Sequence, residues 1–127
     1  MRKLTFLPTL IFTLMFSSTG FAEWTKLSTT VEGDIFYVDF DRIRKRSGYV
    51  YWWELADYLK PGKQGSLSAK VYHQDDCKLF RFKTLSYSFY KEPMGGGIGE
   101  TYIPPDRWIY PPPQSGSETI LKSVCSR

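Results

Sequence analysis

The sequence predicts an α+β protein that is mostly β, with a single antiparallel sheet of about five or six strands and a C-terminal helix tied to it by one disulfide. Three observations support this fold class. Five segments rich in β-branched and aromatic residues follow one another, a helix-capping sequence occurs near the C-terminus, and the chain has just two cysteines. Because the loops between the segments are too short for crossover helices, neighbouring strands should pair antiparallel.

Residues 1–22 have the pattern of a secretory signal peptide. A positively charged start precedes an apolar stretch at 4–16, and small residues lie at the positions that a signal peptidase recognises. These features are carried by Arg2, Lys3, Gly20 and Ala22. The apolar stretch of about 13 residues is too short to span a bilayer, which takes roughly 20, so we favour cleavage over a retained membrane anchor.

Cleavage would leave a mature domain at 23–127 that starts at Glu23, a length typical of one ordinary domain. A bacterial lipoprotein needs a cysteine at the cleavage point, and the first cysteine is Cys77, so we expect no lipid anchor. The protein should therefore be exported without a transmembrane segment, to the periplasm, the cell surface or the medium. The mature domain has 15 basic and 13 acidic residues, and this net charge of +2 is too small to indicate nucleic-acid binding.

Cys77 and Cys125 are the only cysteines, and an exported chain meets an oxidising compartment. We predict that they form one disulfide rather than two free thiols or a metal pair. Closing a loop of about 49 residues stabilises a fold by roughly 4 kcal/mol in the chain-entropy model. That contribution matters in a small domain, which buries only about two-thirds of its unfolded surface.

The first half of the mature domain predicts three strands. Residues 24–27 form a short strand, and the β-branched and aromatic run within 34–39 forms the next. We expect one helical turn within 39–45 and a hairpin at Ser47-Gly48. Residues 49–59 are apolar on both faces near the middle, which indicates a central strand covered in part on each side. One face carries Val50, Trp52 and Ala56, and the other carries Tyr49, Tyr51, Trp53 and Leu55.

Two further strands follow a loop at 61–65. Residues 66–76 alternate, and residues 78–90 form a long aromatic strand with a bend or bulge near Thr84. In the first of these strands, Leu67, Ala69, Val71 and His73 face one side, and Ser66, Ser68, Lys70 and Tyr72 face the other.

The segment after these strands is rich in glycine and then in proline. Residues 93–99 hold four glycines but lack the Lys-Ser/Thr ending and the following helix of a phosphate-binding loop, so we expect a flexible loop. Five prolines between 104 and 113 exclude regular structure from most of the next segment. Trp108 and Tyr110 lie between these prolines and should hold this arm against the sheet.

The chain ends in a predicted amphipathic helix. Residues 115–118 fit a capping box, in which the Ser115 hydroxyl accepts from the Glu118 amide and the Glu118 carboxylate reaches back to the cap. Ile120, Leu121, Val124 and Cys125 then fall on one stripe. A helix of about ten residues is marginal alone, so it should dock on the sheet, with the disulfide tying it to Cys77.

The sequence shows no catalytic or metal-binding pattern. His73 is the only histidine, and a lone histidine on a strand is more often packed than catalytic. Asp75 shares its face, but no nucleophile elbow completes a triad, and scattered carboxylates do not make a metal site. We therefore predict a protein that is not an enzyme and has no cofactor.

Ligand binding is the function class that the composition favours, because aromatic residues make up 17% of the chain and Tyr, Trp and Arg dominate binding hot spots. The candidate site is a basic cluster followed by aromatic residues: Arg42, Arg44, Lys45, Arg46, Tyr49, Tyr51 and Trp53. The basic cluster fits either a solvated turn or an electropositive patch for an acidic glycan, lipid head group or protein surface. The aromatic residues fit either a buried face or an exposed strip.

An ordered set of short motifs extends over nearly all of the mature chain. In chain order these are Trp24, Phe36-Tyr37-Val38-Asp39, Ile43, Gly48, Val50-Tyr51-Trp52, Asp57-Tyr58, Asp76-Cys77, an aromatic strand ending at Tyr90, Pro93-Met94-Gly95, Trp108, Pro112, Ser115 and Val124-Cys125. With this set the chain resembles the surface-adhesin protein E-like domain family of Gram-negative bacteria. The resemblance implies an antiparallel sheet with a disulfide-held C-terminal helix. It also implies binding of host matrix or plasma proteins such as laminin, vitronectin or plasminogen.

Two functional hypotheses follow. The first is an adhesin-like binding module for a host protein or acidic glycan. The second is a periplasmic accessory or structural protein of the envelope that has no host partner. A lysozyme inhibitor would also fit the size, but a domain with net positive charge would be repelled by the usually basic lysozymes.

Overall fold

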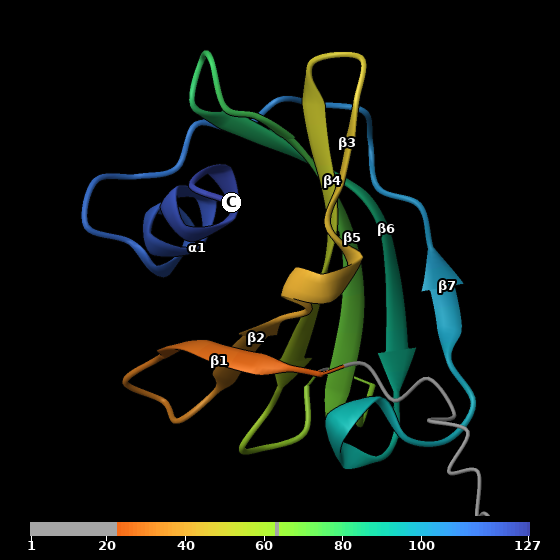
Figure 1. Cartoon of the computed structure of the whole chain (residues 1–127). Coiled ribbons are helices and arrows are strands. Elements are labelled where there is room, and N and C mark those ends of the chain that lie inside the picture. The colour runs from red at the N-terminus through yellow and green to blue at the C-terminus, as the bar shows by residue number, and fades with distance from the viewer. Residues whose placement is uncertain (1–22, 63) are drawn as a thin grey trace, which may run out of the picture.

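The computed structural model describes residues 23–62 and 64–127, so the predicted signal peptide lies outside the described residues. It shows one antiparallel sheet in the order β1-β2-β4-β5-β6-β7, with β3 paired to β4, and one C-terminal helix (Figure 1). The predicted fold class is confirmed. The sheet has seven strands rather than five or six, because two short segments that were expected to be irregular also pair.

All five predicted strands are present. Their bounds are β1 (Thr25–Thr29), β2 (Ile35–Val38), β4 (Tyr49–Asp57), β5 (Ser68–Asp76) and β6 (Arg81–Tyr90). The predicted bulge near Thr84 is confirmed: Tyr72 pairs with Ser86 but His73 pairs with Thr84, which leaves Leu85 as the extra residue.

The first additional strand is β3 (Arg44–Arg46), which pairs with the start of β4. The predicted helical turn is the 3-10 turn η1 (Phe40–Arg42), so the basic cluster is not one solvated turn but is divided between η1 and β3. The hairpin at Ser47 and Gly48 takes φ values of 52° and 82°. Two such residues in succession give the tight turn whose twist matches that of paired strands, which is why β3 can form.

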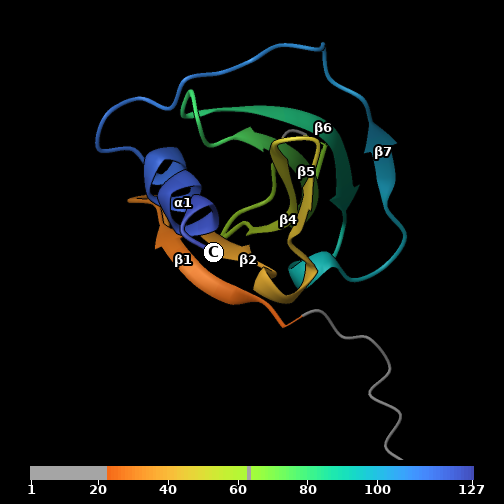
Figure 2. The same cartoon turned by 45° about the horizontal axis from the view of Figure 1, so that its top comes forward.

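Helix α1 (Gly116–Cys125) packs on one face of the sheet, beside β1 (Figures 1 and 2). Its predicted stripe is confirmed: Ile120, Leu121 and Val124 are buried, and a core forms with Val38, Val50 and Trp52. Cys125 is bonded to Cys77 at the end of β5, with a Cα–Cα distance of 5.6 Å. No helix in the described ranges is long and apolar enough to cross a membrane.

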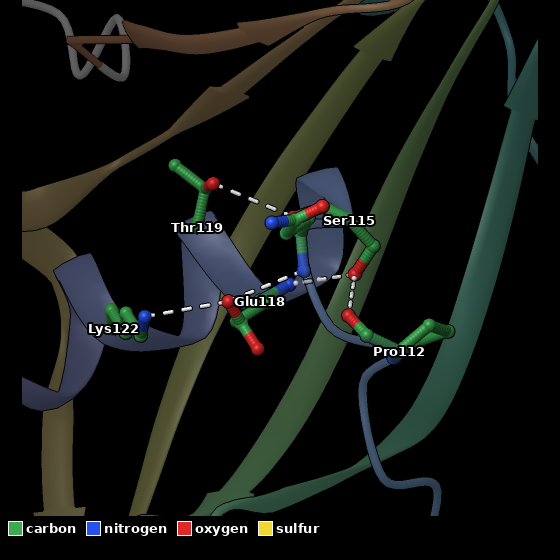
Figure 3. A network of polar contacts seen from close by, with 6 residues as sticks. Pro112, Ser115, Glu118, Thr119 and Lys122 are labelled. Carbon is green, nitrogen blue, oxygen red and sulfur yellow. Dashed lines mark hydrogen bonds and ion pairs between the residues drawn. The ribbon is translucent and has the colours of Figure 1, made fainter.

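The start of α1 differs in one bond from the predicted capping box (Figure 3). As predicted, Ser115 Oγ accepts from the Glu118 amide at 3.1 Å. The Glu118 carboxylate, however, accepts from the amide of Gln114 at 3.4 Å rather than from that of Ser115. The reason is that the Ser115 amide already donates to the Pro112 carbonyl. The helix start is therefore anchored to the last proline run as well as to its own first turn.

The glycine-rich segment is folded onto the sheet. Within residues 93–99, where a flexible loop was expected, it forms the 3-10 turn η2 (Pro93–Gly95), and the edge strand β7 (Glu100–Tyr102) follows directly. The Met94 amide donates to Asp57 Oδ1 and the Gly95 amide donates to Ser68 Oγ, both at 2.8 Å. This turn lies against Leu55, which is fully buried on the side of β4 away from the helix. Both faces of β4 are thus partly covered, as the sequence predicts.

The proline-rich arm follows the free edge of β6 on its way to α1 (Figure 1). Ile109 exchanges two backbone hydrogen bonds with Phe82 of β6. The Trp108 ring lies 5.6 Å from that of Tyr49, so Trp108 does hold the arm against the sheet. Tyr110 is 62% exposed, so its ring is covered less than that of Trp108, but a side-chain hydrogen bond with Arg81 of β6 also links it to the sheet.

Candidate ligand-binding face

The sheet has two unlike faces because side chains alternate along each strand. Val50, Trp52 and Ala56 face the side that α1 covers. The side chains between them on β4 point to the opposite side, which we call the outer face. The register extends this face to β5, where Tyr72 pairs with Trp53, and to β3, where Arg44 pairs with Tyr51.

Five half-buried aromatic residues form a band along the outer face: Tyr49, Tyr51, Trp53, Tyr72 and Trp108. Ring centroids lie 5.6 Å apart for Tyr49 and Trp108, 6.1 Å for Tyr51 and Tyr72, and 4.6 Å for Tyr72 and Trp53. These spacings are within the range of favourable aromatic pairs. The aromatic residues of β4 are therefore neither buried nor a fully exposed strip; each ring supports its neighbour and keeps part of its surface accessible.

Cationic side chains lie over this aromatic band. The Arg46 guanidinium is 4.5 Å from the centre of the Tyr51 ring. At the other end, Arg81 and Lys83 lie 4.3 and 4.5 Å from the centre of the Trp108 ring. A cation within about 6 Å of a ring face is attracted by the ring quadrupole, so the outer face presents fixed positive charge between aromatic surfaces.

Two of these cations are neutralised by neighbouring carboxylates. Lys83 Nζ lies 2.5 Å from Asp106, and Arg81 Nε lies 3.0 Å from Asp76. Burial alone would raise the pKa of Asp76, but hydrogen bonds from the Leu79 amide and from Arg81 hold it below its usual value. Burial would lower the pKa of Arg81, yet its bond to Asp76 raises it. Arg81 and Lys83 therefore mainly orient Trp108.

The structure places the predicted basic residues unequally. Arg44 and Arg46 share the outer face with the aromatic band, and neither has a carboxylate within ion-pair distance among the described residues. Lys45 pairs with Val50 and therefore points to the opposite side. Arg42, in η1, lies 3.4 Å from the buried carboxylate of Asp39. Of the seven candidate residues, five lie together on the outer face: Arg44, Arg46, Tyr49, Tyr51 and Trp53.

Two members of the aromatic band were not predicted from the sequence. Tyr72 was placed on the polar side of its strand, and only the pairing of β4 with β5 brings that side next to Tyr51 and Trp53. Trp108 lies far from Tyr49 along the chain, beyond β5, β6 and β7, and the arm that carries it has no periodic pattern. The one available signal was the pair of aromatic residues between prolines.

A buried polar cluster lies on the helix-covered side. The Trp52 indole donates to Asp75 Oδ2 at 2.8 Å, and the other oxygen, Asp75 Oδ1, has no protein partner among the described residues. His73 lies next to it, with its ring nitrogens 2.8 Å from Glu54 and 3.2 Å from Thr84. These groups border a cavity of about 60 Å³ under α1. Burial raises the pKa of Asp75 to about 6.

This cluster does not resemble a catalytic or metal site. His73 is 6% exposed and packs between Trp52 and Phe82, so the predicted packed role of the lone histidine is confirmed. Ser117 is the one hydroxyl-bearing residue among those that border the cavity, and both ring nitrogens of His73 already have other partners. Within the described residues, no group of three His, Cys, Asp or Glu side chains could hold a metal ion.

Comparison with known proteins supports the architecture. Two crystal structures of Haemophilus influenzae protein E, one of them its crystal form II, share 16% identity with this chain, with TM-scores of 0.61 and 0.63. Each covers 84% of this chain, and the matched part is 86% and 90% of those chains. Protein E from non-typeable H. influenzae gives a TM-score of 0.59 at 16% identity, covering 86% of this chain and 79% of that one. At this identity the likeness shows the fold alone.

No curated protein matched the sequence. The sequence model of the surface-adhesin protein E family, by contrast, matches residues 24–126, which is nearly all of the predicted mature domain. That range holds every strand, the helix and both cysteines. This family match supports an adhesin-like surface protein, exported or exposed at the cell surface. The chain therefore belongs to the surface-adhesin protein E family.

Proposed function

We propose that this protein is a non-enzymatic adhesin-like module that binds an acidic host ligand, a matrix or plasma protein or an acidic glycan, through its outer face. The observation that carries the proposal is the aromatic band with cations stacked on it. Rigid aromatic rings offer contact area at low entropic cost, and Arg beside them is typical of binding hot spots. Arg44 and Arg46 supply positive charge that no carboxylate of the described residues neutralises.

Electrostatic steering sets the expected behaviour. Exposed charges are screened over about 8–10 Å at physiological salt, so affinity for a polyanion should fall as salt rises. Replacing Arg44 and Arg46 together by Ala should weaken binding severalfold, mainly through the association rate, and leave the fold intact because both side chains are exposed. The probe is heparin in surface plasmon resonance at low and physiological salt.

A matched control removes two positive charges elsewhere. Lys60 lies in the loop after β4 and Lys122 lies on the exposed side of α1. The Lys60→Ala/Lys122→Ala protein should bind heparin like the unaltered one. If both double variants lose affinity equally, net charge rather than the outer face explains binding; if neither does, the proposal fails.

Location separates this function from that of a periplasmic accessory protein. An adhesin-like module must be reachable from outside the cell. Protease shaving of intact cells should therefore remove the chain. Full protection in intact cells, together with cleavage after the outer membrane is opened, would favour the accessory role.

A further inference from the structure

The outer face is hollowed at the end of the aromatic band away from Trp108. The hollow has a volume of about 720 Å³, within the range of about 300–1,000 Å³ that is typical of ligand pockets. Three aromatic residues, two cations and a hydroxyl border it: Trp24, Trp53, Tyr90, Arg42, Lys70 and Ser88. Neither Trp24, Tyr90 nor Lys70 belongs to the candidate site that the sequence suggested.

The walls of this hollow come from β4, β5 and β6, from the residue before β1 and from η1. Lys70 of β5 pairs with Ser88 of β6, so their side chains stand next to each other on the outer face. Trp53 of β4 is held by stacking on Tyr72 at 4.6 Å. Trp24 comes directly before β1, whose first residue, Thr25, pairs with Val38. Trp53 and Tyr90 therefore stand on paired backbone, and Trp24 directly precedes a paired residue.

The floor is completed by the glycine turn η2. Gly95 has a φ of 73°, and a Cβ at this position would lie 2.6 Å from Cε of Lys70. A larger residue would be strained and would push Lys70 aside. The turn is fixed by the bonds of its Met94 and Gly95 amides to Asp57 and Ser68. The glycine-rich motif, which is no phosphate loop, thus gives Lys70 its place at the edge of the hollow.

The charges at the hollow are unbalanced by one. Arg42 lies 3.4 Å from Asp39, which is 1% exposed and also borders the hollow, so this pair is close to neutral. Lys70 has no carboxylate within ion-pair distance among the described residues, and its amine lies 5.3 Å from the centre of the Tyr90 ring. One cation in an aromatic hollow calls for a ligand with one anionic group and an apolar ring face.

We propose that this hollow binds a single acidic sugar, a pyranose ring that carries one carboxylate or sulfate. Lys70 is the counter-ion of its acidic group, the indoles of Trp24 and Trp53 contact the C–H face of the ring, and the Ser88 hydroxyl hydrogen-bonds a sugar hydroxyl. A purely apolar ligand would cover the Lys70 ammonium without a counter-charge, at a cost in free energy. The Ser88 hydroxyl lies 3.1 Å from the Thr101 hydroxyl and keeps a further hydrogen-bonding position for the sugar. This inference rests on the proposed function, because such a sugar would be one unit of an acidic host glycan.

The test is a titration of the ¹⁵N-labelled exported protein with glucuronic acid, followed by NMR. The chain has four tryptophans, and each gives one indole signal. Trp24 and Trp53 border the hollow, whereas Trp52 bonds to Asp75 on the other side of the sheet and Trp108 lies at the far end. The signals of Trp24 and Trp53 should shift in a saturable manner, and those of Trp52 and Trp108 should stay in place.

Three probes and two variants decide the chemistry. Glucose has the sugar ring without the charge, and acetate has the charge without the ring. The peptide Gly-Asp-Gly presents a carboxylate as an acidic protein would. Each of the three should bind about tenfold more weakly than glucuronic acid, or not at all. Lys70→Gln removes the charge but keeps a polar side chain, and should weaken binding of glucuronic acid about tenfold. Lys122→Gln, on the helix, should change nothing.

Several results would overturn the inference. Equal shifts with glucose or acetate, stronger binding of the peptide, or an unchanged affinity of Lys70→Gln would each exclude an acidic-sugar site. If heparin binds and depends on Arg44 and Arg46 while glucuronic acid leaves Trp24 and Trp53 unshifted, the hollow is not the site but the proposed function stands. If glucuronic acid binds in a saturable manner but heparin does not bind, the hollow is a sugar site and the proposed function fails.

Discussion

Asp75 is the residue whose environment departs most from what its side chain prefers. It is fully buried, one of its oxygens has no protein partner among the described residues, and the other accepts from Trp52. Burial lifts its pKa from 3.8 to about 6, against the smaller opposing effects of the Trp52 bond and of His73. The folded protein therefore prefers the protonated carboxyl, and the stabilisation due to this preference is complete below pH 3.8 and is lost as the pH rises through about 6.

Replacing Asp75 by Asn should remove this dependence. A shift of about two pKa units corresponds to about 3 kcal/mol, so the variant should gain up to about that free energy of unfolding at pH 8. At pH 3.5 the two proteins should be nearly equal, because the carboxyl is neutral in the folded state and mostly neutral in the unfolded state. Urea unfolding at the two pH values measures this. Asp41→Asn, at an exposed position, is the control; an equal change in both variants would contradict the argument.

The helix-covered side and the outer face also differ in whether their side-chain contacts lie within one strand or across two strands. His73 and Asp75 belong to one strand, and their shared side followed from the alternation of β5 alone. The outer aromatic band needs strand pairing, because Tyr72 reaches Tyr51 and Trp53 across the ladder between β4 and β5. Contacts within one strand were therefore predictable from the sequence, and contacts across strands were not.

At the scale of elements, the strands and the helix were predictable, because each has a strong local pattern. The two short strands were not: β3 is made only of arginine and lysine, and β7 follows four glycines. Neither has an alternating apolar pattern, and each forms because a neighbouring strand offers it an open edge. The hollow was also unpredictable, since Trp24 precedes the first strand and Tyr90 ends β6, far along the chain.

The disulfide should be the largest single stabilising bond between elements. It links α1 to the end of β5 across a separation of 48 residues. Replacing Cys77 and Cys125 together by Ser should lower the free energy of unfolding by about 2–5 kcal/mol. Urea unfolding measures the change, and the unaltered protein treated with a reductant should behave like the double variant. A loss below about 1 kcal/mol would show that the core residues of α1 hold the helix without help.

At the scale of the molecule, the helix makes the two sides of the sheet unequal. It covers the side with Val50 and Trp52, and the arm returns only Trp108 to the other side. The outer face is covered by η2 at one end and by Trp108 at the other, with the aromatic band between them. The domain therefore has one side for stability and one side with exposed aromatic and basic groups.

The exported protein should start at Glu23. The pattern of residues 1–22 motivates this prediction, and the position of Trp24 at the hollow gives it a structural consequence. Cleavage would create an ammonium group one residue from the hollow, adding a positive charge where an acidic ligand is proposed. N-terminal sequencing of protein from the cell envelope measures the start. A retained Met1, or recovery only in the membrane pellet, would contradict it.

The position of Cys125 orders the events by which the domain is completed. Cys125 lies in α1, which follows all seven strands along the chain, so a chain that emerges N-terminus first can close its covalent link only after the strands have appeared. Until α1 docks, Val50 and Trp52 are not covered by the helix, and the sheet exposes an apolar surface on which other chains can aggregate. The disulfide can therefore form only after the strands that it braces have been made. A chain truncated before α1 would keep this apolar surface exposed and could be recognised by chaperones and proteases.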